Sequence, residues 1–387
     1  MTATTTEAQL VDAIRAAPDD DEPRLVYADA IAASDPERGE LIALQCAIER
    51  GGMPRDAAVA ARRRVDDLLA THGARWAPLD GVVVRWTWAR GFVDHATVRG
   101  DVLPVGASQL ARYAPVLRRL DVRGPHRTSA SPRDVAEHAE RTAQVAQRVA
   151  VLLRASTVRV LGLAAFVTPN DPDPTHAALD RLGAAGVLAR LSGLVLHDGP
   201  GLLAAQAHAG RVGALAELEL HGAPVSGVRH LGRWFGPARL CLRDPVGGAS
   251  YADVASLARG ATRLAWLDGI AAMPEDARAR LRGLGVGSLA EAAVELARDP
   301  AFGGLVELDV SARDRIPITS ELLAGLGSAR HLRPRVLRLD ALLEPDAVRA
   351  LAATPLGRAL EVLDLRGRWS SDNARVATSA FDGIVLR

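Results

Sequence analysis

The chain has 387 residues, of which 48% are hydrophobic and 24% are charged, and its formal net charge is +1. These values are those of an ordinary globular protein and argue against a disordered chain or a basic nucleic-acid binder. All 47 basic residues are arginine, since the sequence contains no lysine. P-loop nucleotide binding, protein kinase activity and Schiff-base catalysis are therefore excluded, because each needs a lysine amine.

The first ten residues lack the basic and apolar regions of a signal peptide. No apolar run reaches the roughly 18 residues that a membrane span needs. We therefore expect a cytoplasmic protein that binds neither membrane nor nucleic acid. Its two cysteines, Cys46 and Cys241, match no metal or redox spacing, so we expect core thiols and neither a metal nor a cofactor.

Residues 6 to 75 carry apolar side chains at the three- and four-residue spacing of helices. The segments "APDDDEP", "SDPERGE" and "ERGGMPRD" interrupt this spacing and divide it into four helices. The last helix is expected from about Asp56 to Thr71, with Trp76 packing against the segment that follows. The sequence thus predicts a small all-α domain over residues 1–78.

Ionisable residues are concentrated where the second predicted helix turns into the third. Asp35 is expected to cap the third helix, and Pro36 to occupy its first position. We expect a partly buried ion pair to fix this corner, with Gly39 allowing the close approach of the two helices. The corner is assigned to Arg24, Tyr27, Asp29, Arg38 and Glu40.

Two other interpretations of the corner remain open, a docking surface and an active site. A general acid or base needs a displaced pKa, whereas Arg24 and Arg38 would keep nearby carboxylates ionised. The structural interpretation is therefore preferred. It predicts that Asp29→Ala costs several kcal/mol if the pair is buried.

From residue 80 onward, short apolar runs repeat the template L-x-x-L-x-L. Its first position falls at residues 117, 158, 191, 215, 237, 261, 305, 334, 360 and 381, so that six of the nine steps measure 20 to 29 residues. The segments 123–134 and 168–176 are expected to be protruding loops, because they are rich in Pro and Asp.

This period and template resemble leucine-rich repeats. The resemblance implies an α/β solenoid over residues 79–387, in which irregular repeats form a curved parallel sheet. The leucines would fill the interior, and the alternating residues would face the concave side. The Asn or Cys that such repeats often carry after the last leucine is missing, which affects the turns and not the strands.

The helical segment resembles the bacterial repeat-companion domain, a short module that accompanies leucine-rich repeats. The resemblance covers about residues 7 to 50, and "WARGFVDHATV" at 88–98 resembles the link before the repeats. Ala30 replaces the tryptophan common in the family. The resemblance implies a module that caps the solenoid or docks a partner. It is carried by Pro23, Arg24, Leu25, Tyr27, Ala28, Asp29, Asp35, Arg38, Gly39, Glu40, Leu44 and Gln45.

The concave face of the middle repeats is expected to gather arginines, carboxylates and histidines. Such a mixed surface suits a protein partner, because arginine is enriched at binding hot spots. The alternative is a solvated face whose ion pairs contribute little. The predicted binding residues are His197, Glu217, Glu219, His221, Arg239, Arg243 and Arg263.

The sequence gives little support for a metal site or a phosphate-binding loop. A metal site at His197, His221 and Cys241 is disfavoured because Cys241 falls in a different row of the sheet. "GLGVGS" at 283–288 follows no clear strand, which argues against a phosphate-binding loop. We therefore expect a recognition module and not an enzyme. A hydrolase using the acidic corner or the histidine row, and a regulatory subunit of a neighbouring gene product, remain alternatives; the oligomeric state is not indicated.

Overall fold

The computed structural model describes residues 6–124, 132–164, 173–197, 203, 207–243, 250–267, 270–286, 289–311, 318–340, 345–365, 380–381 and 385–386. The contacts between residues divide the chain into two compact units. Unit 1 comprises Met1–Pro54 and Ala60–Leu215, and unit 2 comprises Arg55–Val59 and Ala216–Arg387. Both units combine helices with mostly parallel strands, which confirms the predicted α/β class.

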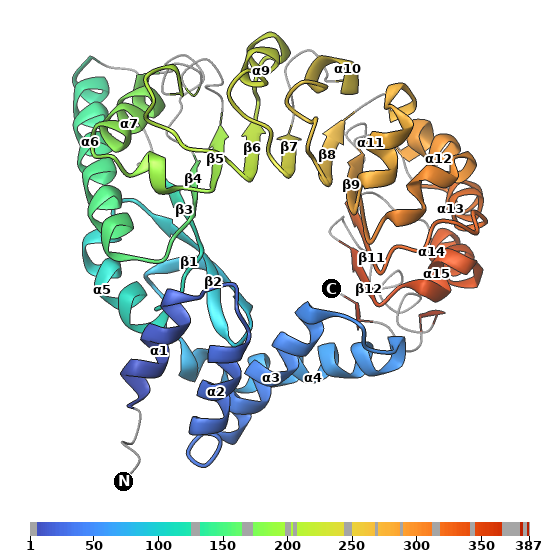
Figure 1. The fold of residues 1–387 in the computed structure, drawn as a ribbon, viewed down its shortest axis with the longest axis horizontal. Helices are drawn as coiled ribbons and strands as arrows, with labels where there is room; N and C mark the ends of the chain where they lie inside the picture. Colours follow the sequence, from blue (N-terminus) through green and yellow to red (C-terminus); the bar gives the residue numbers. More distant parts are fainter. Residues whose placement is uncertain are drawn as a thin grey trace. The chain divides into compact units, whose positions relative to one another are not determined.

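The four predicted helices are confirmed (Figure 1). They are α1 (Glu7–Ala16), α2 (Glu22–Ile31), α3 (Pro36–Arg50) and α4 (Arg55–Trp76). The fourth helix is longer than predicted and ends at Trp76. In unit 1, one face of α1 contributes Leu10 and Ile14 to a core with Tyr27 and Ile42, as their helical spacing requires.

The start of α3 follows the predicted cap. The side chain of Asp35 accepts a hydrogen bond of 3.2 Å from the backbone N–H of Arg38, and Pro36 begins the helix. The helix ends at Gly51, whose φ of 73° is readily adopted only by glycine. Gly39 also permits the expected close approach, because a Cβ there would lie 3.0 Å from the carbonyl oxygen of Ala28 on α2.

An antiparallel hairpin that the sequence did not predict precedes the parallel strands of unit 1. Its strands β1 (Val83–Ala89) and β2 (Phe92–Arg99) turn at Arg90 and Gly91, both of which have positive φ. Parallel pairing then runs from β2 through β5. The remaining elements of the unit are α5 (Leu103–Tyr113), β3 (Arg119–Arg123), α6 (Pro132–Ala155), β4 (Val160–Ala164), α7 (Asp173–Ala184), η1 (Leu188–Arg190) and β5 (Gly193–His197).

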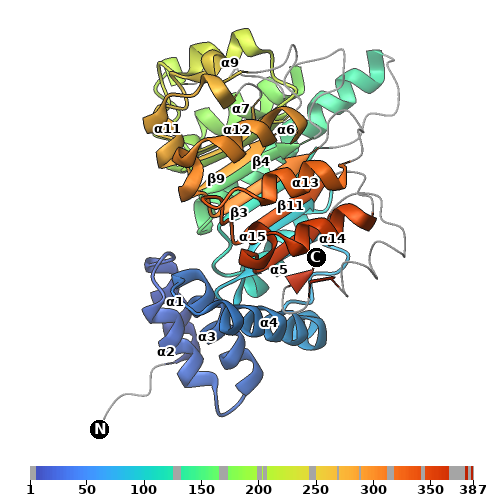
Figure 2. The same cartoon turned by 90° about the vertical axis from the view of Figure 1, so that its right-hand side faces the viewer.

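The strands of unit 2 pair in parallel and in chain order. They are β6 (Glu217–His221), β7 (Arg239–Arg243), β8 (Arg263–Leu267), β9 (Gly283–Val286), β10 (Glu307–Ser311), β11 (Val336–Asp340), β12 (Val362–Leu365) and β13 (Val385–Leu386). The helices of the unit lie on one side of these strands, and α13, α14 and α15 lie side by side (Figures 1 and 2).

The helical segments of unit 2 are short. They are α9 (Val225–Leu231), α10 (Tyr251–Val254), η2 (Ile270–Ala272), α11 (Glu275–Arg280), α12 (Leu289–Arg298), η3 (Pro300–Gly304), α13 (Ser320–Gly327), α14 (Pro345–Ala353) and α15 (Pro355–Ala359). The first turn of α4 also belongs to this unit, where Val59 packs with Val336 and Val362 and Arg55 donates a hydrogen bond of 3.0 Å to the carbonyl oxygen of Leu360.

The core of unit 2 is built from the leucines of the template. Leu218 and Leu220 on β6 are fully buried, as is Leu337 on β11. Neighbouring strands place equivalent residues opposite each other, for example Leu218 opposite Leu240. Burial of each such side chain contributes roughly 1.5 to 3 kcal/mol before entropy is subtracted. The predicted parallel strands are thus confirmed, and so is the inward direction of their leucines.

One strand of unit 2 was missed. The segment "GLGV" was not expected to be a strand, yet it forms β9 between β8 and β10. Leu281, Leu284 and Val286 occupy the template offsets, so the step from 261 to 305 divides at 281 into 20 and 24 residues. "GLGVGS" therefore begins as a buried strand and not as a loop.

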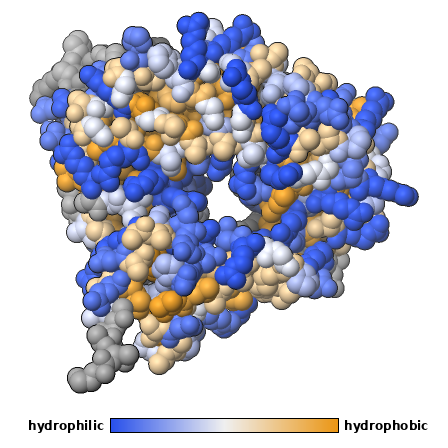
Figure 3. Space-filling view, viewed as in Figure 1, coloured by the Kyte–Doolittle hydropathy of each residue, from blue (hydrophilic) through white to orange (hydrophobic). Residues whose placement is uncertain are grey.

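The surface shows no concentrated apolar patch in the view of Figure 3, where hydrophilic and hydrophobic residues are interspersed. Large exposed apolar side chains such as Val26, Val151 and Trp234 come from separate elements. None of the helices in the described residues combines the length and the apolar character needed to cross a membrane. The predicted loop 168–176 lies mostly outside the described residues, as does most of 123–134.

Candidate functional site

The strands of unit 2 carry a row of charged residues on the face opposite their leucines. Glu217 on β6 lies opposite Arg239 on β7, which lies opposite Arg263 on β8. The next row places Glu219 opposite Cys241. This order follows from the alternation of side chains along each strand. We call this surface the arginine face and define it as Glu217, Glu219, His221, Arg239, Arg243, Arg263, Glu307, Asp309, Arg338 and Asp364.

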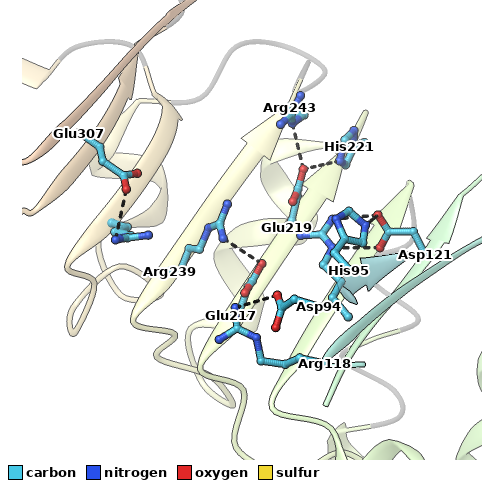
Figure 4. Close-up of polar contacts among 12 residues, drawn as sticks. Asp94, His95, Arg118, Asp121, Glu217, Glu219, His221, Arg239, Arg243 and Glu307 are labelled. Atoms are coloured by element: carbon cyan, nitrogen blue, oxygen red, sulfur yellow. Dashed lines mark hydrogen bonds and ion pairs between the residues drawn. The ribbon is translucent and has the colours of Figure 1, made fainter. Parts of the chain in front are cut away.

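The first pairs of the arginine face join β6 and β7 (Figure 4). Arg239 lies 3.4 Å from Glu217, and Arg243 lies 2.9 Å from Glu219. Glu219 also bonds to the Nε2 atom of His221 at 2.8 Å and is only 5% exposed. Burial alone would lower the pKa of Arg243, but the charge of Glu219 and smaller contributions from Cys241 and Asp309 together outweigh it and raise that pKa.

The next pair crosses the strand β9, whose residues on this face are the glycines Gly283 and Gly285. Arg263 on β8 reaches over Gly283 on β9 to Glu307 on β10, with a closest distance of 3.4 Å. A Cβ at Gly283 would lie 3.1 Å from the Cγ of Arg263, so glycine leaves the room for this reach. Arg338 on β11 completes the series, at 3.4 Å from Glu307 and 3.7 Å from Asp364.

A shallow cavity of about 70 Å³ lies within the arginine face. Its floor consists of small residues on three adjacent strands, and four arginines stand around it. The floor is Cys241, Ala265, Gly283 and Gly285, and the surrounding arginines are Arg239, Arg243, Arg263 and Arg338. The carboxylates of Glu307 and Asp309 also line the cavity. The arrangement can receive a protruding side chain that carries a hydrogen-bond acceptor.

The histidines and the cysteine of this region do not form a metal centre. Burial and the charge of Glu219 raise the pKa of Cys241 to about 12, so its thiol stays protonated at neutral pH. His221 is bonded to Glu219. No cluster of three metal-binding side chains occurs among the residues that the structure describes. The backbone of His197 ends β5, but its side chain lies outside what the structure describes.

The predicted ion pair at the helix corner does not form. Asp29 is exposed and, within the described residues, has no ion-pair partner. Glu40 instead makes a two-bond contact with Arg64 on α4, at 2.8 and 2.6 Å. This contact lowers the pKa of Glu40, which does not suit a general acid. The prediction was wrong because α4 packs on α3 and brings an arginine from a distant part of the sequence.

Arg38 is held by aromatic rings and not by a carboxylate. Its Cζ atom lies 5.2 Å from the ring centre of Trp76, 4.9 Å from that of Trp88 and 5.3 Å from that of Phe92. Burial lowers the pKa of Arg38 to about 10, so the guanidinium stays charged at neutral pH. Two of these rings come from the unpredicted hairpin, and for this reason the sequence did not indicate the contact.

The other two corner residues have separate partners. Arg24 is buried, donates a hydrogen bond of 3.1 Å to the carbonyl oxygen of Asp20 and lies 5.9 Å from the ring centre of Phe92. The hydroxyl of Tyr27 donates to Glu7 at 2.8 Å. Burial and this bond raise the pKa of Tyr27. The corner therefore holds four contacts in place of the predicted ion pair, and those of Arg24 and Arg38 share the ring of Phe92.

Unit 1 has a polar cluster of its own on its strands (Figure 4). Asp121 on β3 bonds to His95 on β2 at 2.8 Å and accepts a hydrogen bond from Arg119 at 3.0 Å. Although burial opposes it, these bonds lower the pKa of Asp121 to about 2. Gly162 on β4 provides the space, since a Cβ there would meet the Oδ1 atom of Asp121 at 2.1 Å. The sequence did not identify His95.

Comparison with known proteins adds no assignment to this geometry. A scan against models of protein families finds no match, and a search of the curated proteins finds no similar sequence. The resemblance to a repeat-companion domain therefore stays a prediction.

Proposed function

We propose that the chain is a recognition protein that binds another protein through the arginine face of unit 2. The observation that carries the proposal is the small-residue floor of Cys241, Ala265, Gly283 and Gly285, surrounded by four arginines. Arginine contributes strongly to protein interfaces, because its planar group makes paired hydrogen bonds and stacks on aromatic rings. The carboxylates of this face hold the arginines in position before a partner arrives, which reduces the entropy cost of binding.

We further propose that the strands belong to an irregular leucine-rich-repeat solenoid and that the helices before residue 78 are a repeat-companion domain. Support comes from the buried leucines at equivalent offsets, from the parallel pairing in register, and from the division of the longest step at β9. Stacked units of this kind bury their leucines only against neighbouring units. One extended face is then left open to a ligand.

Affinity capture tests the binding proposal. The tagged chain and an Arg239→Glu/Arg263→Glu variant are exposed to an extract of the organism that supplies the gene, and bound proteins are identified by mass spectrometry. Both side chains are about half exposed, at 48% and 47%. Because the new glutamates face Glu217 and Glu307, circular dichroism must first show that the variant keeps the wild-type fold. We expect at least one protein to be retained by the wild-type chain and lost with the variant.

A matched control changes two exposed arginines on the helical side of the same unit, in an Arg259→Glu/Arg298→Glu variant. The total charge change is identical, and only its position differs. The control should retain the partner, and purified partner should bind it with the wild-type affinity. Loss of binding in both variants, or in neither, contradicts a role for the arginine face.

A further inference from the structure

A second and larger cavity lies within unit 1 and has no part in the function proposed above. Its volume is about 480 Å³, and α1, α2, α3, the end of α4 and α5 contribute to its wall. Pockets for small molecules usually measure about 300 to 1,000 Å³. The cavity therefore has the size of a ligand site.

Arg38 on the wall of this cavity has unused hydrogen-bonding capacity. The residue is only 9% exposed, and its Nε atom is buried without a hydrogen-bond partner. In the part of the chain that the structure describes, no carboxylate or carbonyl oxygen bonds to its guanidinium. The three aromatic rings around it attract the charge, but they do not satisfy N–H groups that lie in the guanidinium plane. A buried charge in this state is costly unless an acceptor is supplied.

The carboxylates of the cavity are bonded to other donors and, among the described residues, form no hydrogen bond with the guanidinium of Arg38. Asp35 accepts from Arg75 at 2.9 Å and from the indole N–H of Trp76 at 2.9 Å. Glu7 accepts from Tyr27 at 2.8 Å. Among the lining residues, Arg38, Arg75 and Arg112 stand against Asp35 and Glu7, which leaves one positive charge in excess.

Apart from Ser34, the remainder of the wall is apolar or aromatic. Val11 and Ile31 come from α1 and α2, and Phe92, Tyr113 and Pro115 come from β2, the end of α5 and the segment after it. The cavity thus offers one desolvated cation beside a surface suited to a flat or branched hydrocarbon group. A planar guanidinium can bind either a carboxylate or a phosphate group through paired hydrogen bonds.

We propose that this cavity binds a small organic anion, whose carboxylate or phosphate group is held by Arg38 and whose apolar body packs against Phe92 and Tyr113. The anion completes the hydrogen bonds of the guanidinium and neutralises the excess charge. Neutral molecules of the same shape lack both interactions and bind weakly.

Tryptophan fluorescence provides the test, because Trp76 lies in the cavity wall. The full chain is titrated with benzoate, with phenyl phosphate and with neutral benzamide. We expect a saturable change with at least one of the anions and at least about tenfold weaker binding of benzamide. The anion that binds more tightly distinguishes a carboxylate from a phosphate ligand. No saturable change with either anion, or equal affinity for benzamide, overturns the proposal.

Substitutions in and outside the cavity wall test whether the anions bind at this site. Arg38→Gln should weaken the binding of the anions about tenfold or more, whereas Arg64→Gln, outside the cavity, should leave it unchanged. Arg38 is buried and its loss affects folding, so an exposed lining residue provides a second pair. Ser34→Glu adds a negative charge at the cavity and should weaken anion binding about threefold or more relative to Ser34→Gln. Equal affinities of these two folded variants contradict the proposed site.

Discussion

Asp35 connects two helices of unit 1, α3 and α4, through one carboxylate. It caps α3 through the N–H of Arg38, and it accepts hydrogen bonds from Arg75 and Trp76 at the end of α4. A capping side chain contributes about 0.5 to 2 kcal/mol, and each further hydrogen bond about 1 kcal/mol. The same atoms thus fix both the start of α3 and the end of α4.

We predict that Asp35→Ala lowers the free energy of unfolding by about 2.5 to 4 kcal/mol, because the cap and both side-chain bonds are lost. Urea unfolding followed by circular dichroism measures the change. Asp29→Ala is the matched control and should change the free energy by less than about 0.5 kcal/mol, since Asp29 is exposed. Equal effects of the two substitutions would show that the contacts of Asp35 contribute nothing.

Asp121 should give stability a defined pH dependence. Its pKa is lowered from 3.8 to about 2, so the stabilisation is complete above pH 4 and is lost as the pH falls through 2. The shift corresponds to about 2 kcal/mol. We predict that the difference in unfolding free energy between the wild-type chain and Asp121→Asn shrinks by this amount between about pH 5 and pH 2. Urea titrations across that range test it, and a difference that is independent of pH would refute it.

At the residue scale, the sequence predicts what local spacing controls and fails where partners are distant. Asp35 was recognised as a cap because the capped N–H lies three residues away. The contacts of Glu40 with Arg64 and of Arg38 with Trp88 depend on how α3, α4 and the hairpin pack. Glu217 and Arg239 were both expected on the concave face, and they are neighbours because equivalent positions of consecutive strands pair in register.

At the scale of elements, the packing of α2 against α3 depends on a glycine. A Cβ at Gly39 would lie 3.0 Å from the carbonyl oxygen of Ala28 and 3.7 Å from the Cα of Ala32. Both neighbours are backbone atoms and cannot move without moving the helix. The close packing of α2 against α3 therefore depends on the absence of a side chain at residue 39.

We predict that Gly39→Ala destabilises unit 1, although alanine is the better helix former by about 1 kcal/mol. The control is Gly73→Ala in α4, where an added Cβ meets nothing within 4 Å. That change should raise the free energy of unfolding by up to about 1 kcal/mol. Urea unfolding of both variants gives the sign of each change in the free energy of unfolding. Stabilisation by Gly39→Ala would mean that the helices separate without cost.

The strands show which elements a sequence reveals. Regularly spaced leucines predicted most of the parallel strands, because burial imposes the pattern directly. The strand β9 was missed because Gly283 and Gly285 occupy its other face and glycine is unfavourable in strands. The glycines are explained by tertiary structure, since the side chain of Arg263 crosses that face of β9 to reach Glu307. The hairpin of β1 and β2 was missed because it lies before the repeating template begins.

At the scale of the whole molecule, each compact unit contains one cysteine. Cys46 belongs to unit 1 and is fully buried, and Cys241 belongs to unit 2 and is 5% exposed. Burial is the main cause that raises the pKa of the first thiol to about 11 and that of the second to about 12. A thiol reagent attacks the thiolate, so reaction requires that the unit around each cysteine opens.

We therefore predict that neither thiol reacts with Ellman's reagent under native conditions at about pH 8, and that both react at once in urea, at least about a hundredfold faster.

Chains with a single thiol, Cys46→Ala and Cys241→Ala, assign the reaction to unit 2 and unit 1 respectively. Each substitution removes a buried sulfur, so circular dichroism of the variants must first match that of the wild-type chain. Because each thiol becomes reactive when its own unit opens, the urea dependence of the two reactions reports the stability of each unit separately. Rapid reaction of either thiol in the native chain would show that the core around it is open to solvent, contrary to the burial described above.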